Sequence, residues 1–242
     1  MRRPSSQLIV AVMLAGVLWA VAAAPPTAAA LTLAPGSLPW MYTGAGSGSL
    51  GTWTTAIRST STDAEFALAR SGVWVYGDSI TRADYGHLAA GLSARGLPSA
   101  VDAQGSLPSV PAVERLAARV ARQGPPRVLV MATGSNDIYR PTFIAGATRS
   151  VRAVVGPTTR VVWVNVFVRR ASVGATMQAA DLVNTNAVNA ATALAPADAV
   201  VDWYGYLTKD PARLTTHLRD GVHTTAVGQA ARNGLILAAV QG

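Results

Sequence analysis

Four short polar segments carry the residue types that acyl transfer requires. They are Gly77-Asp78-Ser79-Ile80, Gly105-Ser106, Gly134-Ser135-Asn136-Asp137 and Asp220-Gly221-Val222-His223. A serine hydroxyl becomes a good nucleophile when a neighbouring imidazole takes its proton, and a carboxylate usually holds and stabilises that imidazole. The oxyanion of the tetrahedral intermediate then needs fixed hydrogen-bond donors. Together, the four segments contain each of these groups.

Each candidate group can be assigned one role in such a reaction. Ser79 is the candidate nucleophile, His223 the candidate base and Asp220 the candidate acid. Asp220 lies three residues before His223, so one turn of the chain could bring its carboxylate to the Nδ1 side of the imidazole. The backbone N–H groups of Ser79 and Gly105 and the side-chain amide of Asn136 are the candidate donors of an oxyanion hole.

The same residues also have structural interpretations. Ser79 or Asp220 could cap the helix that follows it, and Asn136 could belong to a tight turn. Gly105 could be required only for its backbone angles, and His223 could be a loop histidine bonded to the backbone. No single segment decides between the two interpretations. The occurrence of all four segments in this order favours catalysis.

The segments lie within a regular alternation of predicted strands and helices. Strands are expected at 73–76, 99–103, 128–131, 161–168 and 199–203, and helices at 84–95, 111–123, 142–155, 176–194 and 224–240. This alternation predicts an α/β fold, a three-layer α/β/α sandwich around a mainly parallel five-stranded sheet. Sites in such sheets form outside the carboxyl ends of the strands. Three of the four polar segments follow a predicted strand and should therefore meet at that edge.

The order Gly-Asp-Ser, Gly, Gly-x-Asn-Asp and Asp-x-x-His resembles that of the SGNH hydrolases, also called GDSL-type esterases. The resemblance covers roughly residues 72 to 240. It implies a three-layer sandwich that hydrolyses esters without a cofactor. The functional Ser, Gly, Asn and His of that family match Ser79, Gly105, Asn136 and His223, with Asp220 as the acid.

The match to this family has three further features. Asp78 corresponds to the aspartate beside the nucleophile, which is not the triad acid of the family. Ile80 replaces the usual leucine, and the second segment lacks the asparagine that often precedes Gly105. The stretch 201–204, Val-Asp-Trp-Tyr, is similar to SGNH domains attached to membrane acyltransferases that O-acetylate cell-envelope sugars.

The sequence argues against three other classes of protein: α/β-hydrolases, dinucleotide-binding enzymes and zinc enzymes. The chain has no Gly-x-Ser-x-Gly, so the nucleophile elbow of the α/β-hydrolases is absent from the sequence. Gly46-x-Gly48-x-x-Gly51 matches a dinucleotide fingerprint in letters, but it follows no predicted strand and opens no predicted helix. Three scattered histidines and no cysteine make a zinc site improbable. We expect neither a cofactor nor a metal.

Composition and charge restrict the partners. Half of the 242 residues are hydrophobic and 13% are charged, which suits a buried core and not a disordered polyelectrolyte. The formal net charge is +8, yet no basic run is longer than two residues, which argues against nucleic acid. An anionic cell wall or lipid surface is a better match for this charge.

Two further sites have open interpretations. Arg169-Arg170 is either a solvated pair or a contact for an acidic or sugar-rich substrate. Asn189 is expected to be a packing contact.

The N-terminal residues have the pattern of an export signal. Within residues 1–30, Arg2-Arg3 precedes an apolar stretch at 8–24 and a small-x-small cleavage site at 28–30. The alternative is an uncleaved anchor, because 17 apolar residues lie at the lower limit for a membrane span. Residues 31–70, rich in Gly, Ser, Thr and Pro, should form an extended arm or edge element before a hydrolase domain at 71–242. No later stretch is long and apolar enough to span a membrane.

The residues and the family resemblance together imply a secreted or cell-envelope-associated serine esterase. It would form an acyl-Ser79 intermediate and act on short acyl esters of carbohydrate or envelope glycolipid. Transfer of the acyl group to an envelope sugar is the first alternative, because water and a sugar hydroxyl compete for one acyl-enzyme. A non-catalytic envelope-binding module is the second. The sequence leaves the oligomeric state and the acyl chain length open.

Overall fold

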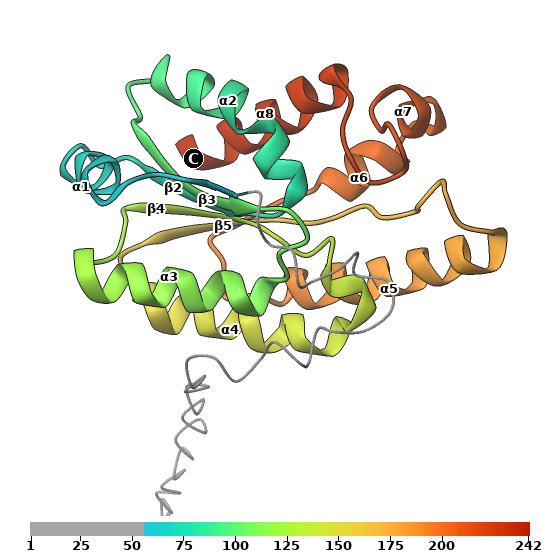
Figure 1. The fold of residues 1–242 in the computed structure, drawn as a ribbon, viewed down its shortest axis with the longest axis horizontal. Coiled ribbons are helices and arrows are strands. Elements are labelled where there is room, and N and C mark those ends of the chain that lie inside the picture. Colours follow the sequence, from blue (N-terminus) through green and yellow to red (C-terminus); the bar gives the residue numbers. More distant parts are fainter. Residues whose placement is uncertain (1–55) are drawn as a thin grey trace, which may run out of the picture.

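The computed structural model describes residues 56–242, which build one sheet between two layers of helices (Figure 1). The strands are β1 (Ala56–Arg58), β2 (Val73–Gly77), β3 (Ser99–Gln104), β4 (Val128–Ala132), β5 (Arg160–Val164) and β6 (Ala199–Val201), in the order β1-β3-β2-β4-β5-β6. β1 is antiparallel to β3 and all other neighbours are parallel. The predicted α/β fold with a mainly parallel sheet is confirmed, but the sheet has six strands instead of five.

The helices divide between the two faces of the sheet. They are α1 (Ser61–Ala69), α2 (Ser79–Ser93), α3 (Ser109–Gln123), α4 (Ile144–Val155), α5 (Ala175–Ala193), α6 (Trp203–Thr208), α7 (Pro211–Thr216) and α8 (Ala226–Gln241), with short 3-10 turns at Asp137–Tyr139 and Pro141–Phe143. Figure 1 shows α3, α4 and α5 below the sheet and α2, α6, α7 and α8 above it. In the described part of the chain, no helix is both long and apolar enough to cross a bilayer.

The core is split by the sheet into two hydrophobic clusters. Trp74 and Tyr76 of β2 belong to the cluster under α3 and α4, whereas Val73 and Val75 belong to the cluster under α2 and α8. Successive side chains of a strand point to opposite faces, so a strand covered by helices on both faces buries side chains on both sides. This explains the uninterrupted apolar runs of β2 and β4.

The sixth strand comes from residues that were assigned to the N-terminal arm. β1 pairs with β3 at the edge of the sheet, and α1 follows with a capping box between Thr60 and Asp63. Ala64 and Ala67 of α1 are fully buried in the same cluster as Trp74. Residues 56–70 therefore pack as part of the domain expected at 71–242. The predicted signal peptide at 1–30 and the rest of the predicted arm, 31–55, lie outside the described residues.

β5 ends four residues earlier than the prediction of 161–168. Asn165 turns the chain toward α6: its side chain donates to Asp202 at 2.7 Å and accepts from the Tyr204 N–H at 2.8 Å. Asp202 in turn caps α6 through the Gly205 N–H. This cap also ends β6 at Val201, before the predicted residue 203.

The chain beyond β5 is held by a side chain instead of a neighbouring strand. The amide of Asn189 on α5 accepts from the Val166 N–H at 2.9 Å and donates to the Val166 carbonyl at 2.8 Å. Val166, Phe167 and Val168 are apolar because their side chains are buried, and this apolar run led to the prediction of a longer strand. Asn189 is therefore a hydrogen-bond partner of the backbone, not merely a packing contact.

Candidate active site

Ser79 stands where the central strand β2 passes into α2. Asp78 caps the helix by accepting from the Ile80 N–H at 3.0 Å, and Ser79 is the first helical residue. The helix expected at 84–95 thus starts at Ser79 instead. N–H groups in a first helical turn have no intrahelical acceptor, so the Ser79 N–H is available to a ligand. A Cβ on Gly77 would lie 2.3 Å from that of Thr81, so this sharp turn requires glycine.

Ser79, His223 and Asp220 form a continuous chain of hydrogen bonds. The Ser79 Oγ lies 2.9 Å from His223 Nε2, and His223 Nδ1 lies 2.8 Å from Asp220 Oδ2. Neither Ser79 nor Asp220 is a helix cap, since Asp78 caps α2 and Thr225 caps α8. The structure thus gives both residues the contacts that the catalytic interpretation requires.

The carboxylate of Asp220 is stabilised in its ionised form. Partial burial alone would raise its pKa, but bonds from the backbone and ring of His223 and from the Val222 N–H hold that pKa below its usual range. Oδ1 accepts the two backbone N–H groups, which leaves Oδ2 for the imidazole. An ionised carboxylate at Nδ1 fixes one tautomer of the ring and leaves Nε2 to accept the serine proton.

The loop that carries Asp220 and His223 is fixed against the segment that follows β5. The Arg169 N–H donates to the Gly221 carbonyl and the Ala171 N–H to the Asp220 carbonyl, both at 2.9 Å. Gly221 has a φ of +81°, and a Cβ there would lie 1.8 Å from the Arg169 carbonyl oxygen. Glycine is required at this position because the two backbones approach so closely.

A buried polar cluster holds the other end of this loop. Thr224 donates its hydroxyl to both carboxylate oxygens of Asp84 on α2 at 3.1 Å. Asp84 also lies 3.8 Å from the guanidinium of Arg232 on α8, and both side chains are almost fully buried. Because Thr224 follows His223 directly, this cluster anchors the chain next to His223 to α2.

The three candidate oxyanion donors line the same cavity. Its volume is about 430 Å³, and it is lined by Ser79, Arg82, Gly105, Ser106, Ser135, Asn136, Tyr139, Val168, Arg170, Ser172, Asp220, Val222 and His223. Asn136 Nδ2 lies 3.4 Å from the Leu107 carbonyl and from Ser135 Oγ, long contacts that leave it able to bind a stronger acceptor. A Cβ on Gly105 would meet nothing within 4 Å. The cavity therefore has room for a reacting group beside the Gly105 N–H.

Two serines that the sequence did not single out hold this edge of the sheet in place. Ser135 donates to the buried carboxylate of Asp78 at 2.5 Å. Ser109, the first residue of α3, donates its N–H and hydroxyl to Asp137 at 2.9 and 2.8 Å. The carboxylate that binds the His223 ring is that of Asp220, whereas the carboxylate of Asp78 accepts from Ser135 and the Ile80 N–H. The signal for Ser135 was its position within a polar segment at a strand end, and Ser109 lies three residues after Ser106, the last residue of another such segment.

Asp137 should give the stability of the protein a measurable pH dependence. Complete burial raises its pKa from 3.8 to about 6, against the bonds from Ser109. Between these values the folded state binds more protons than the unfolded state, so the unfolding free energy should fall as pH rises, by at most about 3 kcal/mol. Asp137→Asn should remove this part of the slope. Denaturant unfolding at pH 4, 5, 6 and 7 measures it, and an identical slope in the variant would contradict the assignment.

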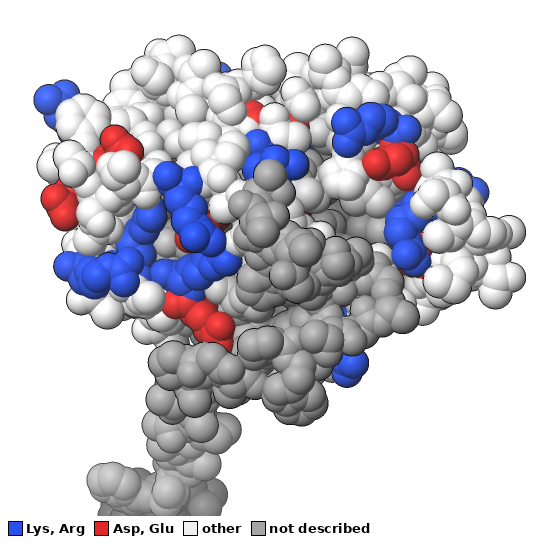
Figure 2. Space-filling view, viewed as in Figure 1, with Lys and Arg blue, Asp and Glu red and all other residues white. Residues whose placement is uncertain are grey.

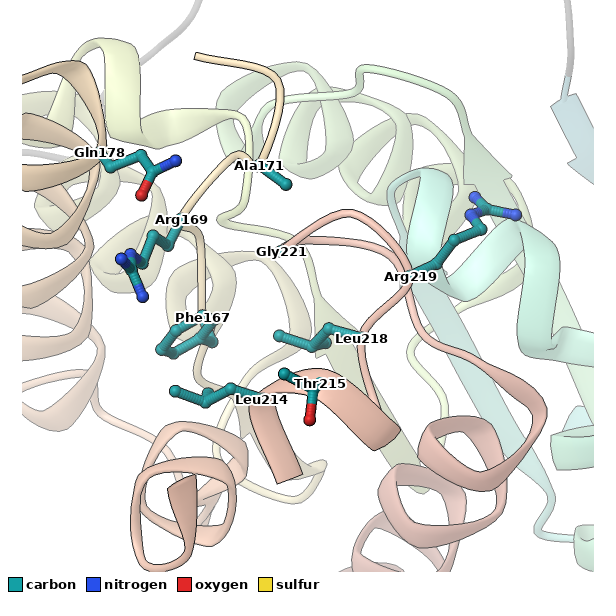
Figure 3. A pocket seen from close by; sticks show the side chains of 9 residues that line it. All are labelled: Phe167, Arg169, Ala171, Gln178, Leu214, Thr215, Leu218, Arg219 and Gly221. Carbon is teal, nitrogen blue, oxygen red and sulfur yellow. The ribbon is translucent and has the colours of Figure 1, made fainter. Parts of the chain in front are cut away.

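The pair Arg169-Arg170 is divided between two cavities. Residues 167–172 run alongside the loop 219–222, and their side chains alternate: Val168, Arg170 and Ser172 line the catalytic pocket. Phe167, Arg169 and Ala171 line a second cavity of about 420 Å³ on the other side. Figure 3 shows this second cavity, with Arg169 on the side of Gln178. Of these two arginines, only Arg170 faces the pocket in which a substrate would bind at Ser79.

Comparisons with known proteins show the family of the chain. A family model described as GDSL-like lipase/acylhydrolase matches residues 75–231, a range that contains Ser79, Asn136 and His223. No curated protein matches the chain in sequence.

Several solved structures share the fold at low sequence identity. The C-terminal catalytic domain of peptidoglycan O-acetyltransferase A from Streptococcus pneumoniae is 18% identical, with a TM-score of 0.55 over 70% of this chain and 92% of that one. A lipase/acylhydrolase from Enterococcus faecalis is 20% identical, with a TM-score of 0.55 over 71% and 96%. The acetylxylan esterase Axe2 from Geobacillus stearothermophilus is 16% identical, with a TM-score of 0.51 over 72% and 97%.

The family match spans most of the described residues, and the neighbours have the fold of SGNH hydrolases. The resemblance seen in the four polar segments is thereby confirmed, and the chain belongs to the GDSL-like lipase/acylhydrolase family.

Proposed function

We propose that this protein is a serine esterase in which Ser79, His223 and Asp220 are the catalytic triad. The observation that carries the proposal is the unbroken path from the Ser79 Oγ through His223 to Asp220, with distances of 2.9 and 2.8 Å. The path opens into the cavity that Gly105 and Asn136 also line.

The reaction would proceed in two steps through a covalent intermediate. Ser79 Oγ attacks the ester carbonyl carbon while His223 Nε2 takes its proton, and Asp220 stabilises the imidazolium that forms. The N–H groups of Ser79 and Gly105 and the amide of Asn136 bind the oxyanion. Collapse of this intermediate expels the alcohol, which receives the proton from His223. Water then repeats the sequence on acyl-Ser79 and releases the acid.

We propose short acyl esters of carbohydrate or envelope glycolipid as the substrates. Nine of the thirteen residues that line the pocket are polar or charged, which suits a hydroxylated alcohol better than a long acyl chain. Two of the structural neighbours are named as a peptidoglycan O-acetyltransferase and an acetylxylan esterase. The expected export of the chain would place such an enzyme outside the cytoplasm or at the envelope.

A series of 4-nitrophenyl esters from acetate to dodecanoate tests the acyl part of this proposal. We expect kcat/KM to be highest for acetate to butyrate and to fall by at least about tenfold by octanoate, because most residues that line the pocket are polar or charged and a long alkyl chain would have to pack against them. The acetyl groups released from O-acetylated xylan or peptidoglycan test the alcohol part. Rising kcat/KM with chain length would contradict the proposal.

Acyl transfer to a sugar is the second candidate, favoured by the fold shared with an O-acetyltransferase domain. The acyl-Ser79 intermediate would be the same, and a sugar hydroxyl would replace water. Mass spectrometry of products formed with 4-nitrophenyl acetate and chitooligosaccharides distinguishes the two. Acetylated sugar in excess of free acetate would favour the transferase, and free acetate alone would favour the esterase.

A further inference from the structure

Two arginines line the catalytic pocket, and only one of them is neutralised. The guanidinium of Arg170 binds both carboxylate oxygens of Asp181 on α5, with distances from 2.7 to 3.2 Å, and it lies over the ring of Tyr139. Asp181 is nearly fully buried, so this pair is fixed. The positive charge of Arg170 is therefore neutralised by Asp181, and its side chain forms part of the pocket wall.

Arg82 lies on α2, one turn after Ser79, and has no such partner. Its Nε is completely buried and makes no hydrogen bond within residues 56–242, and none of the ion pairs of those residues includes it. A buried donor without an acceptor costs free energy and calls for an explanation, such as a bound ligand.

The rest of the chain cannot supply the missing negative charge. Every Asp and Glu lies at position 63 or later, so residues 1–55 contain no carboxylate. Within the pocket, Asp220 is bound to His223 and to two backbone N–H groups. The neighbouring Asp78 is bound to Ile80 and Ser135. Figure 2 shows red acidic side chains beside some of the blue groups, and other blue groups without a red neighbour, on the face it presents. The free charge of Arg82 is thus unusual among the groups that line the site.

We propose that Arg82 is an anion-binding subsite of the catalytic pocket, and that the natural ester carries a carboxylate or phosphate on its carbohydrate part. The inference rests on the proposed esterase function, which places the ester bond at Ser79. Positions i and i+3 of a helix are neighbours and both residues line the cavity, so an anion bound to Arg82 would lie in the same pocket as the reacting carbonyl. The acyl groups proposed above, such as acetyl, are uncharged, so the anion belongs to the alcohol. A guanidinium binds carboxylate or phosphate oxygens through two parallel N–H groups.

Arg169 provides a matched control for this inference. It carries the same charge and lies close to the catalytic loop, but its side chain lines the second cavity, shown in Figure 3, and not the catalytic pocket. Arg169→Gln and Arg82→Gln therefore change the net charge equally. A general effect of positive potential would appear in both variants, and a specific subsite only in Arg82→Gln.

Matched aryl acetates measure the subsite during catalysis. The probes are 4-acetoxybenzoate and 4-acetoxyphenyl phosphate, with 4-acetoxybenzamide as the neutral reference. Each ratio of kcat/KM, charged over neutral, is compared between proteins, so the intrinsic reactivity of the esters cancels. We expect Arg82→Gln to lower the ratio about ten- to a hundredfold, as for loss of a charge-assisted hydrogen bond, mainly through KM. We expect Arg169→Gln to leave the ratio unchanged. The two charged probes show whether carboxylate or phosphate is preferred.

Binding without chemistry separates failure of this inference from failure of the proposed function. Ligand-observed NMR on Ser79→Ala protein should detect glucuronate or glucose 6-phosphate in preference to glucose. That preference should be lost when Arg82→Gln is added and kept when Arg169→Gln is added. If no ester is hydrolysed but the preference follows Arg82, the esterase proposal fails and the subsite stands. Equal loss in both variants, or no preference for the anions, would overturn the subsite.

Discussion

Replacing Ser79 with alanine is expected to lower kcat/KM for 4-nitrophenyl acetate by about 10³- to 10⁶-fold. The variant loses the only oxygen that lies 2.9 Å from His223 Nε2 among the described contacts, so no acyl-enzyme can form at this position. The residual rate should reflect only the oxyanion donors and the base acting on water. Initial rates of purified protein, followed by 4-nitrophenolate release, measure the effect.

The structure allows this loss to be separated from unfolding. Asp78, and not Ser79, caps α2, so the helix should keep its start and the melting temperature should change little. Ser172→Ala is the matched control, because this serine lines the same pocket and should retain the wild-type rate. Ser79→Ala activity within tenfold of wild type would contradict the assigned nucleophile, as would an equal loss in Ser172→Ala.

Replacing Asp220 with asparagine should lower kcat by about 10³- to 10⁴-fold. The asparagine oxygen can still accept the N–H groups of Val222 and His223, which preserves the loop. The side-chain amide that replaces Oδ2 cannot stabilise an imidazolium, and its N–H favours the tautomer in which Nε2 carries the proton. That tautomer cannot accept the proton of Ser79.

Stopped-flow or steady-state kinetics together with a melting curve test this second prediction. KM should change little, since Asp220 acts on the base and not on the ground-state ester. Asp210→Asn is the control: Asp210 caps α7 through the Ala212 N–H and is remote from His223 in the hydrogen-bond network. An Asp220→Asn enzyme with near wild-type kcat would show that the imidazole is oriented by other groups.

Much of the fold followed from local patterns in the sequence. The central strands β2 and β4 are apolar at every position because both their faces are buried, and α3 ends at Gly124, whose φ of +83° suits a helix end. Predictions from these sequence patterns were wrong where a contact between distant residues determines the extent of a strand or helix. The extent of β5 depends on Asn189, which comes from a helix 23 residues later and binds Val166.

Short elements escaped prediction for a related reason. α6 and α7 have only six residues each and follow the N-cap residues Asp202 and Asp210. Helices this short contain too few apolar residues to show a helical period in the sequence. α1 is held by the burial of Ala64 and Ala67 against the sheet. The surrounding sequence is rich in Ser and Thr and has no hydrophobic pattern from which this contact could be predicted. These elements rely on packing more than on hydrophobic periodicity.

The residues of the candidate site could be found from the sequence because the fold brings strand ends together. Ser79, Gly105 and Asn136 follow three neighbouring strands, and the loop of His223 meets them at that edge. The distribution of charge could not be found in this way. Whether Arg169 or Arg170 faces the pocket depends on the alternation of one extended segment, and the unpaired state of Arg82 depends on every carboxylate around it.

The most direct test of the triad is the intact mass of the protein after reaction with a fluorophosphonate. We expect a single adduct on the wild-type protein, at Ser79, because only a serine activated by a base reacts readily. Ser79→Ala and His223→Ala should both remain unmodified while folded. An adduct that persists in Ser79→Ala, or a folded wild-type protein that does not react, would contradict the assignment and favour a binding module over an enzyme.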